Sequence, residues 1–456
     1  MGEQAHRPKS MPCVRSQPNP SLSGAGTIGV STALFAHQES GAEWLAGRRT
    51  GRGYLGDEPG TGKSRTLIRA CQLADVRKPL VVCPASVRTH WAREFAALGW
   101  ARREPTILSY QQVSLGGFTL HEALRAEGHD ALVLDEAHLL RNSQAARTSM
   151  LLGRDGYARG MRRVFLASGT PVVKNPSNLW TVLSSCFPEV ARAHRLGNRW
   201  DFIDRFCVTQ NRLEHGYFKT RILPELRNAP EFHDILGAVM LRRTNADLGL
   251  DVPELFWQPM VLDVEGVDKG PPIAGLSDEE WADLQNDPEI ARLRRKVGEA
   301  KVGEVVRLLA SQLDDSDEKI CVFAHHRSVL GKLRAGLLLF GTAYIDGGTA
   351  QGDRDAAIAR FASDPSCRVF IGQSQACGTG TDGLQKSGAK RLILVEPDWT
   401  AENNLQLAKR LARLGQGSDH VIAQMVTLAG TLDEAIVSRN LRETRMLTQA
   451  GLRVAE

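Results

Sequence analysis

The sequence predicts an α/β protein in which two lobes, each built on a parallel β-sheet, follow one another along the chain. Short apolar runs alternate with longer stretches of helical spacing, and this alternation occurs in both halves of the chain. Each apolar run ends at polar or glycine-rich residues, as buried parallel strands do at the sheet edge that carries ligand chemistry. The predicted strands are 80–83, 131–134 and 164–167 in the first half, and 320–323, 369–371 and 392–395 in the second.

Length and composition are those of a globular protein. The chain has 456 residues, of which 42% are hydrophobic and 24% charged, so a wholly disordered or fibrous protein is excluded. Length alone would predict about three domains. The net charge is only +5, so a polyanion must be held in a local groove rather than on a uniformly basic surface. Because no apolar run is long enough for a membrane span and no signal pattern opens the chain, we expect no membrane partner. The expected location is the cytoplasm, at the nucleoid of a cell or in the host cytoplasm for a viral protein.

The cysteines show no spacing typical of a metal site or of a disulfide framework. No Cys-x-x-Cys pair occurs, and no histidine pair has the spacing of a zinc finger. We therefore expect buried, reduced thiols and no zinc. The positions are Cys13, Cys71, Cys83, Cys186, Cys207, Cys321, Cys367 and Cys377.

Shifts in composition divide the chain into four segments. Residues 1–30 are rich in Pro, Ser, Gly and Gln and lack apolar periodicity, which predicts a flexible tail with no assigned function. We expect the first lobe, with a helical insertion, at 31–260, a linker with a helical segment at 261–299, and the second lobe at 300–456. From about 178 to 298 the pattern is mostly helical and aromatic.

The glycine-rich segment GDEPGTGKS, residues 56–64, follows an apolar pair and opens a predicted helix. It resembles a phosphate-binding loop. Backbone N–H groups around Gly60 and Gly62 would wrap phosphate oxygens, and Lys63 would place its charge on the same oxygens. The Ser64 hydroxyl would ligate Mg²⁺. A strict motif has glycine at the second position of this segment, so a glycine-rich turn without a ligand stays an alternative.

An acidic pair, Asp135 and Glu136, ends the predicted strand 131–134. A carboxylate at a strand end can hold the metal of a nucleotide, and its neighbour can orient and deprotonate the attacking water. We assign Asp135 to magnesium and Glu136 to the water. Two acids at a helix N-cap would look the same in isolation, but the loop upstream favours ATP hydrolysis with Mg²⁺ as the chemistry.

A basic helix is predicted far downstream, in QLAKRLARLGQ at 406–416. Arg410 and Arg413 are three residues apart, which places them on one helical face. An arginine projected from the second lobe onto the γ-phosphate would supply transition-state charge only when the lobes close. Taken alone, such a face is usually solvated; with the other two motifs it predicts that hydrolysis is coupled to lobe movement.

The order of these motifs resembles that of superfamily-two helicases, and specifically the Swi/Snf-like branch of double-stranded DNA translocases. The resemblance covers about residues 31–440. The blocks in the first half are LFAHQESGAEWL (34–45), DEPGTGKS (57–64), VVCPASVRTHWAREF (81–95), DEAHLLRN (135–142), SGTP (168–171) and MLRR (240–243). Those in the second half are CVFAHHR (321–327), IDGGTAQGDRDAAIARF (345–361), the basic helix and GTLDEAI (430–436). The histidine pair at 325–326, the segment IDG at 345–347 and Lys301 resemble the annealing-helicase, fork-remodelling subgroup.

The resemblance implies two RecA-like lobes in tandem, with helical insertions between them. The family's loop has the form DE-x-G-x-GK-[ST], which accounts for the acid in place of the first glycine. In this family Gln38 would read adenine, while Thr170 and Gln406 would couple hydrolysis to lobe movement. The nucleotide-binding set implied is Gln38, Asp57, Glu58, Pro59, Gly60, Thr61, Gly62, Lys63 and Ser64. Positions that depart from the common family residues are Pro59, Thr61, Gln385, Lys386, Lys409 and Ala412.

The family also implies that both lobes hold the phosphates of one DNA strand in a groove opposite the ATP cleft. Such contacts give affinity without sequence information. Taken singly, each candidate is also typical of a helix cap or a surface position. The candidates are Ser86, Arg88, His325, His326, Arg327, Thr379 and Gln385.

The expected function is an ATP-dependent translocase that moves along or remodels duplex or forked DNA, aimed by a protein partner or by the DNA structure itself. No alternation of aromatic and basic residues suited to single-strand stacking is found, which favours duplex tracking. A strand-separating helicase acting on DNA or RNA is the alternative within the enzyme class. A nucleic-acid clamp or scaffold that binds ATP without turnover is the alternative from another class.

Overall fold

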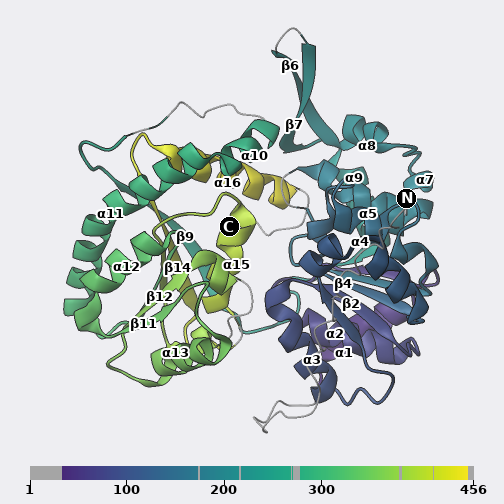
Figure 1. Ribbon diagram of the computed structural model, residues 1–456, viewed down its shortest axis with the longest axis horizontal. Helices are drawn as coiled ribbons and strands as arrows, with labels where there is room; N and C mark the ends of the chain where they lie inside the picture. Colours follow the sequence, from purple (N-terminus) through teal and green to yellow (C-terminus); the bar gives the residue numbers. More distant parts are fainter. Residues whose placement is uncertain are drawn as a thin grey trace, which may run out of the picture.

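Two six-stranded sheets, each with all of its strands parallel, form the centres of two lobes (Figure 1). The computed structural model describes residues 33–172, 175–214, 217–268, 270, 278–378, 383–413 and 415–449. In spatial order the first sheet contains β3 (Thr106–Ser109), β2 (Pro79–Cys83), β4 (Ala131–Asp135), β5 (Arg163–Ala167), β1 (Arg52–Leu55) and β8 (Met240–Leu241). The second contains β11 (Thr342–Ile345), β12 (Val369–Gln373), β10 (Ile320–Ala324), β13 (Arg391–Leu394), β14 (His420–Leu428) and β9 (Glu254–Leu262).

All six strands predicted from apolar runs are present, and the predicted pair of RecA-like parallel-sheet lobes is confirmed. Successive side chains of a strand point to opposite faces, and both faces are buried in each lobe. Leu132 and Leu134 of β4 pack into one hydrophobic cluster, whereas Ala131 and Val133 pack into another. Burial on both faces explains why these strands are continuous apolar runs.

Helices cover both sheets. The helices of the first lobe are α1 (Ala36–Ala46), α2 (Lys63–Leu73), α3 (Arg88–Ala97), α4 (Tyr110–Ala126), α5 (Ala146–Leu152), α6 (Trp180–Cys186), α7 (Pro188–Ala193), α8 (Arg199–Phe206) and α9 (Ala229–Val239). Those that follow are α10 (Asp278–Asn286), α11 (Pro288–Asp314), α12 (Arg327–Gly336), α13 (Gln351–Ser363), α14 (Ser374–Gly378), α15 (Ala401–Leu411) and α16 (Leu432–Gln449). Local sequence sets several starts: the side chains of Ser109 and Asn198 cap the first backbone N–H groups of α4 and α8.

Strand β9 belongs to the second sheet, although its residues fall almost entirely within the range 31–260 that we assigned to the first lobe. It pairs with β14 along its whole length, from Glu254 opposite His420 to Leu262 opposite Leu428. The chain therefore crosses to the second lobe before residue 254.

The region from 178 to 298 contains a β-hairpin that the helical pattern did not predict. Strands β6 (Cys207–Glu214) and β7 (Tyr217–Leu226) pair antiparallel and project away from the first lobe (Figure 1). The expectation of a mostly helical segment is therefore corrected for these residues, which include the β-branched Val208, Thr209, Thr220 and Ile222, a residue type that favours strands. The phenylalanines nearby are core residues: Phe187, Phe202, Phe206 and Phe232 are fully buried.

The last helix bridges the lobes. Helix α16 follows β14 of the second sheet and runs toward the first lobe, where it contacts β7 (Figure 1). Its Met446 is 1% exposed and packs within the hydrophobic cluster of the first lobe. This helix therefore joins the two lobes by apolar packing, apart from the chain connection at β9.

The cysteines that the structure describes are all buried and form no disulfide bond with one another, in agreement with the prediction of buried, reduced thiols. The predicted tail at 1–30 and Cys13 lie outside the described residues. Among the helices that the structure describes, none is long and apolar enough to cross a membrane.

Candidate active site

A cavity of about 670 Å³ lies between the two lobes and is lined by residues of both. The first lobe contributes the phosphate loop, the acidic pair at the end of β4 and Thr170 after β5. The second lobe contributes one face of α13 and the end of α15. The structure thus brings all of the predicted catalytic, metal-binding and coupling residues to one place, and these are Lys63, Ser64, Asp135, Glu136, Thr170, Gln406, Arg410 and Arg413.

The loop between β1 and α2 has the geometry of a phosphate cradle. Gly60 and Gly62 have φ values of 93° and 80°, a left-handed conformation that favours glycine. A Cβ at Gly62 would also lie 2.2 Å from Nε2 of Gln38. Helix α2 begins at Lys63, at the cavity. The backbone N–H groups of its first turn have no partner within the helix and can therefore bind an anion there.

The Lys63 ammonium is held inside this loop. Its Nζ donates to the backbone oxygens of Asp57 at 3.0 Å and Glu58 at 3.1 Å. Burial lowers the pKa of Lys63, an effect opposed by the negative charges of Glu136 and Asp135. The lysine is therefore positioned at the phosphate loop, with the acidic pair beside it.

Asp57, which replaces the first glycine of a strict phosphate loop, anchors the loop instead of facing the cavity. Its side chain is 1% exposed and accepts hydrogen bonds from the backbone N–H and the guanidinium of Arg243. The neighbouring Arg242 donates through Nη1 to the backbone oxygens of Gly56 and Gly169. The segment after β8 thus fastens the loop, a role that sequence reasoning did not assign to either arginine.

Other predicted nucleotide-binding residues are held by specific contacts of the loop. Gln38 is buried and donates from Nε2 to the backbone oxygen of Thr61 at 3.1 Å, which ties α1 to the loop. Glu58 lies 3.8 Å from Nζ of Lys409, an ion pair between the lobes. Pro59 packs against Gly169, where a Cβ would lie only 2.8 Å from the proline ring.

The acidic pair combines a strained backbone with opposite pKa shifts. Asp135 ends β4, and its Oδ2 accepts a hydrogen bond from the Trp91 indole at 2.9 Å. Burial and the neighbouring charge of Glu136 raise the pKa of Asp135. Glu136 has φ 52°, a conformation that non-glycine residues rarely adopt and that often marks a functional position. Burial opposes ionisation of Glu136, but its hydrogen bond with His138 and the charge of that ring outweigh burial and lower its pKa.

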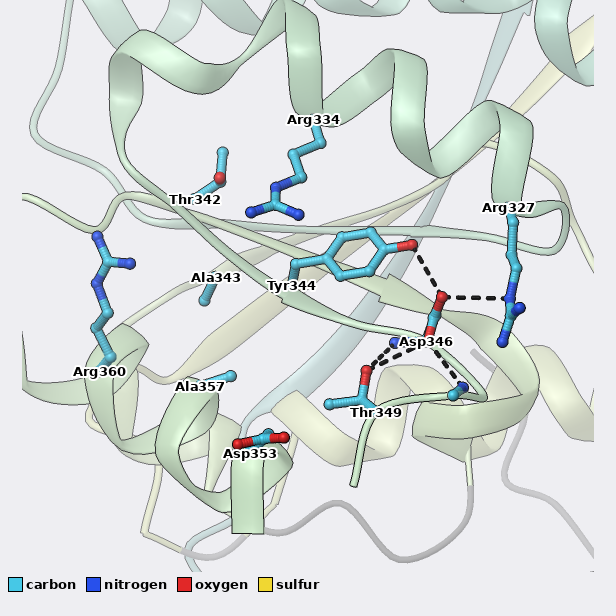
Figure 2. A pocket seen from close by; sticks show the side chains of 11 residues that line it. Arg327, Arg334, Thr342, Ala343, Tyr344, Asp346, Thr349, Asp353, Ala357 and Arg360 are labelled. Atoms are coloured by element: carbon cyan, nitrogen blue, oxygen red, sulfur yellow. Dashed lines mark hydrogen bonds and ion pairs between the residues drawn. The ribbon is translucent and has the colours of Figure 1, made fainter. Parts of the chain in front are cut away.

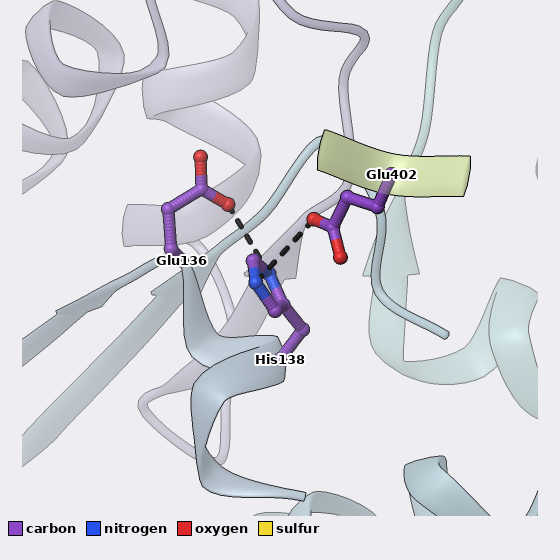
Figure 3. Close-up of side chains that lie close together, drawn as sticks. All are labelled: Glu136, His138 and Glu402. Atoms are coloured by element: carbon purple, nitrogen blue, oxygen red, sulfur yellow. Dashed lines mark ion pairs between the residues drawn. The ribbon is translucent and has the colours of Figure 1, made fainter. Parts of the chain in front are cut away.

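The predicted coupling residues meet at a carboxylate that the sequence did not single out. Thr170 of the first lobe donates from its hydroxyl to Glu402 of α15. Gln406, one turn later on α15, donates from Nε2 to the same carboxylate oxygen at 3.1 Å. Glu402 also lies 3.3 Å from Nε2 of His138, the histidine that follows the acidic pair (Figure 3). No motif matched Glu402, and only its burial between the lobes identifies it.

The two arginines of the basic helix both line the cavity, but they do not share a helical face. Helix α15 ends at Leu411, so Arg413 lies beyond it, and the expected i, i+3 arrangement is corrected. Arg410 donates through Nε and Nη2 to the backbone oxygen of Gly378, at 3.2 and 2.7 Å. Arg413 lies against the phosphate loop: a Cβ atom built on Gly60 would be 3.8 Å from the Cβ atom of Arg413.

A second, more open pocket of about 690 Å³ lies on the second lobe beside the edge strand β11 (Figure 2). Arg327, Arg334 and Arg360 line it, and the Arg334 guanidinium lies 5.1 Å from the centre of the Tyr344 ring. Arg327 pairs with Asp346, with Nε and Oδ2 3.2 Å apart. Helix α13 separates this pocket from the interlobe cavity, since one face of the helix lines the pocket and another face lines the cavity.

The predicted DNA contacts are not all exposed side chains. Arg327 is well exposed, whereas His326 pairs with buried Glu396, Nδ1 and Oε1 being 2.6 Å apart. His325 is partly buried, and this burial lowers its pKa. Gln385 is 8% exposed, and its Oε1 accepts a hydrogen bond from the backbone N–H of Gly383. Arg88 opens α3 and donates to the backbone oxygen of Ile107 at 3.3 Å. Thr379 and the Ser86 side chain lie outside the described part of the structure.

The donors at the cavity fit a magnesium ion. The Ser64 hydroxyl at the start of α2 and the Asp135 carboxylate at the end of β4 line the same cavity, and both offer the hard oxygen ligands that Mg²⁺ requires. Within the described residues, Glu136, His138 and Glu402 form another group whose ligand atoms lie within 4.8 Å of one another. There the two carboxylates face different nitrogens of the ring, which suits two hydrogen bonds better than one metal ion.

Comparisons with known proteins identify the two lobes. A model of the SNF2-related domain matches residues 106–265, and a model of the helicase conserved C-terminal domain matches residues 300–415. The DNA annealing helicase and endonuclease ZRANB3 of Mus musculus is 28% identical over 91% of this chain and 40% of its own length. The SWI/SNF-related matrix-associated actin-dependent regulator of chromatin subfamily A-like protein 1 of Xenopus tropicalis is 28% identical over 92% of this chain and 45% of its own length.

The chain thus spans less than half the length of these curated relatives. Among solved structures, the SWI2/SNF2 ATPase core of Sulfolobus solfataricus in complex with dsDNA matches with a TM-score of 0.40 and 18% identity, over 92% of this chain and 93% of that one. An SNF2-related domain and a helicase C-terminal domain follow one another here, in the order that the motifs predicted. The two domain matches and these relatives confirm the predicted resemblance to the Swi/Snf-like branch of the superfamily-two helicases.

Proposed function

We propose that this chain is an ATP-dependent motor that moves along or remodels DNA. The observation that carries the proposal is the interlobe cavity: a phosphate loop and an acidic pair from one lobe face two arginines from the other. Phosphoryl transfer depends mainly on positioning and on neutralising charge, and these residue types supply both. The family and its named relatives, which include a DNA annealing helicase, support the same function.

The residues of the cavity divide the work of hydrolysis. The backbone N–H groups at the start of α2 and the Lys63 ammonium would bind the β- and γ-phosphates. Mg²⁺, bound with the nucleotide by Ser64 and Asp135, would neutralise developing charge on the phosphate oxygens. Glu136, whose pKa is lowered, is ionised at neutral pH and can orient the attacking water and accept its proton.

The second lobe completes the site only when the lobes lie together. Arg413 lies against the phosphate loop, and Arg410 lines the same cavity from the end of α15. Their charge would therefore reach the γ-phosphate in the closed arrangement and withdraw when the lobes part. Each cycle of binding and hydrolysis would then move one lobe relative to the other.

The surface of the second lobe offers positive charge for the phosphates of DNA. Arg327, predicted as a contact, lies in the open pocket with Arg334 and Arg360 (Figure 2). Because α13 forms a wall of both this pocket and the interlobe cavity, its movement on lobe closure would shift both together. We propose duplex or forked DNA as the substrate, with targeting by a protein partner or by the DNA structure.

The test is ATPase activity measured without nucleic acid and with single-stranded DNA, blunt duplex DNA, forked duplex DNA or RNA. The proposal predicts strong stimulation by duplex or forked DNA. Equal stimulation by single strands or RNA would favour the strand-separating helicase. Nucleic-acid binding without turnover under every condition would contradict the motor and favour the ATP-gated clamp.

A further inference from the structure

We propose that Glu402, a side chain of the second lobe, is a positioning residue for ATP hydrolysis: through His138 it fixes the orientation of Glu136 when the lobes are together. This inference rests on the proposed function, because it assigns the water-activating role to Glu136. Glu402 does not touch the phosphate loop, and its proposed effect is exerted through the first-lobe residues that it contacts.

The position of Glu402 is unusual for an acidic residue in the first turn of a helix. Thr400 caps α15, and an acid two residues later is favoured by the helix dipole without any partner. Such residues are normally solvated, whereas Glu402 is only 6% exposed. Burying a carboxylate is costly unless hydrogen bonds satisfy it, so its partners carry the explanation.

Those partners come from both lobes and converge on one oxygen. Oε1 of Glu402 accepts hydrogen bonds from the Thr170 hydroxyl and, at 3.1 Å, from Nε2 of Gln406. The same oxygen lies 3.3 Å from Nε2 of His138. Thr170 and His138 belong to the first lobe, and Gln406 belongs to the same helix as Glu402. The carboxylate is therefore an acceptor that joins the lobes at the motifs expected to couple them.

The other side of the His138 ring faces the catalytic carboxylate (Figure 3). Its Nδ1 lies 2.8 Å from the Ser168 hydroxyl and 3.3 Å from Oε2 of Glu136. Ser168 in turn donates to the same oxygen of Glu136 at 3.0 Å. A continuous set of contacts thus runs from Glu402 through the imidazole to Oε2 of Glu136, which leaves Oε1 of Glu136 outside this set and able to meet water.

This arrangement needs both ring nitrogens of His138 to donate, as they do in an imidazolium. Although burial opposes the charged ring, the charge of Glu402 and the hydrogen bond and charge of Glu136 raise the pKa of His138. If the second lobe withdraws, Glu402 leaves with it, and the ring loses the acceptor on its Nε2 side. Glu136 then keeps Ser168 but loses a fixed imidazolium, so its orientation depends on lobe closure.

The experiment compares Glu402→Ala and Glu402→Gln with the matched control Glu434→Gln, which changes an exposed carboxylate in the first turn of α16. Thermal unfolding of each full-length variant verifies that it folds. The inference predicts that Glu402→Ala lowers DNA-stimulated kcat about tenfold while KM for ATP changes by no more than about twofold. Glu402→Gln should fall between Ala and the control, because the amide oxygen can still accept from Thr170 but carries no charge.

A second readout does not require turnover. The ring pKa of His138, measured by NMR on ¹³C-histidine-labelled protein with His138→Asn for assignment, should fall in Glu402→Ala and stay unchanged in Glu434→Gln. An unchanged His138 pKa, or a kcat equal to that of the control, would overturn the inference. If the natural chain shows no ATPase activity, the proposed function fails on that measurement, and the NMR result alone decides whether Glu402 holds His138.

Discussion

The carboxylate of Asp57 and the guanidinium of Arg243 form a buried ion pair, with Oδ2 and Nη2 2.5 Å apart, that fastens the phosphate loop to the segment after β8. Arg243 also donates to the backbone oxygen of His37 at 2.9 Å, so the same side chain holds α1. One residue therefore joins three segments around the nucleotide site. The acid that replaces the first glycine of the loop has a structural role that depends on this arginine.

Removing this arginine should destabilise the protein. Arg243→Met leaves the Asp57 carboxylate buried without its partner, which typically costs about 3 kcal/mol in the free energy of unfolding. Urea denaturation measures the destabilisation, and KM for ATP should rise because the loop is no longer held. The matched control is Arg102→Met, which breaks a solvent-exposed pair with Asp75 and should destabilise the protein much less. Equal destabilisation of the two variants would contradict the anchoring role.

Arg413 should act on the chemical step more than on nucleotide binding. Arg413→Ala removes a charge beside the phosphate loop, and loss of an arginine finger typically lowers kcat by about 1,000-fold. Binding of a fluorescent ATP analogue should change little, since the loop itself is intact. The control Arg442→Ala removes an exposed arginine of α16 and should leave kcat unchanged. A large loss of analogue binding with unchanged kcat would instead assign Arg413 to ground-state binding.

The arginine pocket of the second lobe should contribute to DNA affinity. The double variant Arg334→Gln and Arg360→Gln removes two positive charges, so the slope of log K against log salt should fall by roughly 0.9 for each DNA phosphate that these arginines neutralise. Fluorescence anisotropy with a labelled duplex at several salt concentrations measures this slope. Arg307→Gln, an exposed arginine on α11, is the matched control. A slope identical to that of the control would place the DNA elsewhere on the lobe.

The contact between the lobes should weaken as the pH rises. The pKa of His138 is raised in the folded protein above its ordinary value of 6.5, so its stabilising contribution is complete below that value and is lost as pH passes through the raised pKa. Burial also raises the pKa of Glu402, which acts in the same direction. The positive charge of Arg141 acts the other way, because it lowers the pKa of His138 and the pKa of Glu402.

Energy transfer between dyes on the two lobes, measured without nucleotide, should therefore report a larger separation at alkaline pH. The His138→Asn variant should show a smaller change with pH, because only the contribution of Glu402 remains. An equal alkaline opening in His138→Asn would show that another group controls the separation.

The sequence predicted the parts of the fold and site that depend on local order along the chain. Buried strands are apolar runs, and a phosphate loop or an acidic pair such as Asp135 and Glu136 is a contiguous pattern with a fixed chemical meaning. Pairing partners are not local, so the transfer of β9 to the second sheet could not be read from residues 254–262 alone. Glu402 follows the same logic: it lies in the polar run AENN and is buried only because the other lobe covers it.

The end of α15 shows a further limit of local patterns. The spacing of Arg410 and Arg413 predicts a shared helical face, yet the helix stops at Leu411, where Ala412 leaves the helical conformation with ψ 80°. No proline or glycine stands between these positions, so nothing in the local sequence marks the end. Both arginines nevertheless line the cavity, Arg410 from the last turn of the helix and Arg413 from the loop that follows it.

Displacement of a third strand from a DNA triplex tests the central claim most directly, because it requires movement along duplex DNA and not strand separation. The natural chain with ATP should displace the third strand, whereas Glu136→Gln, which keeps the shape of the side chain but lacks the base, should bind ATP and displace none. Turnover of Glu136→Gln should fall by at least about 100-fold. Displacement by Glu136→Gln equal to that of the natural chain, or duplex-stimulated ATP hydrolysis by the natural chain without any displacement, would contradict an ATP-driven DNA motor.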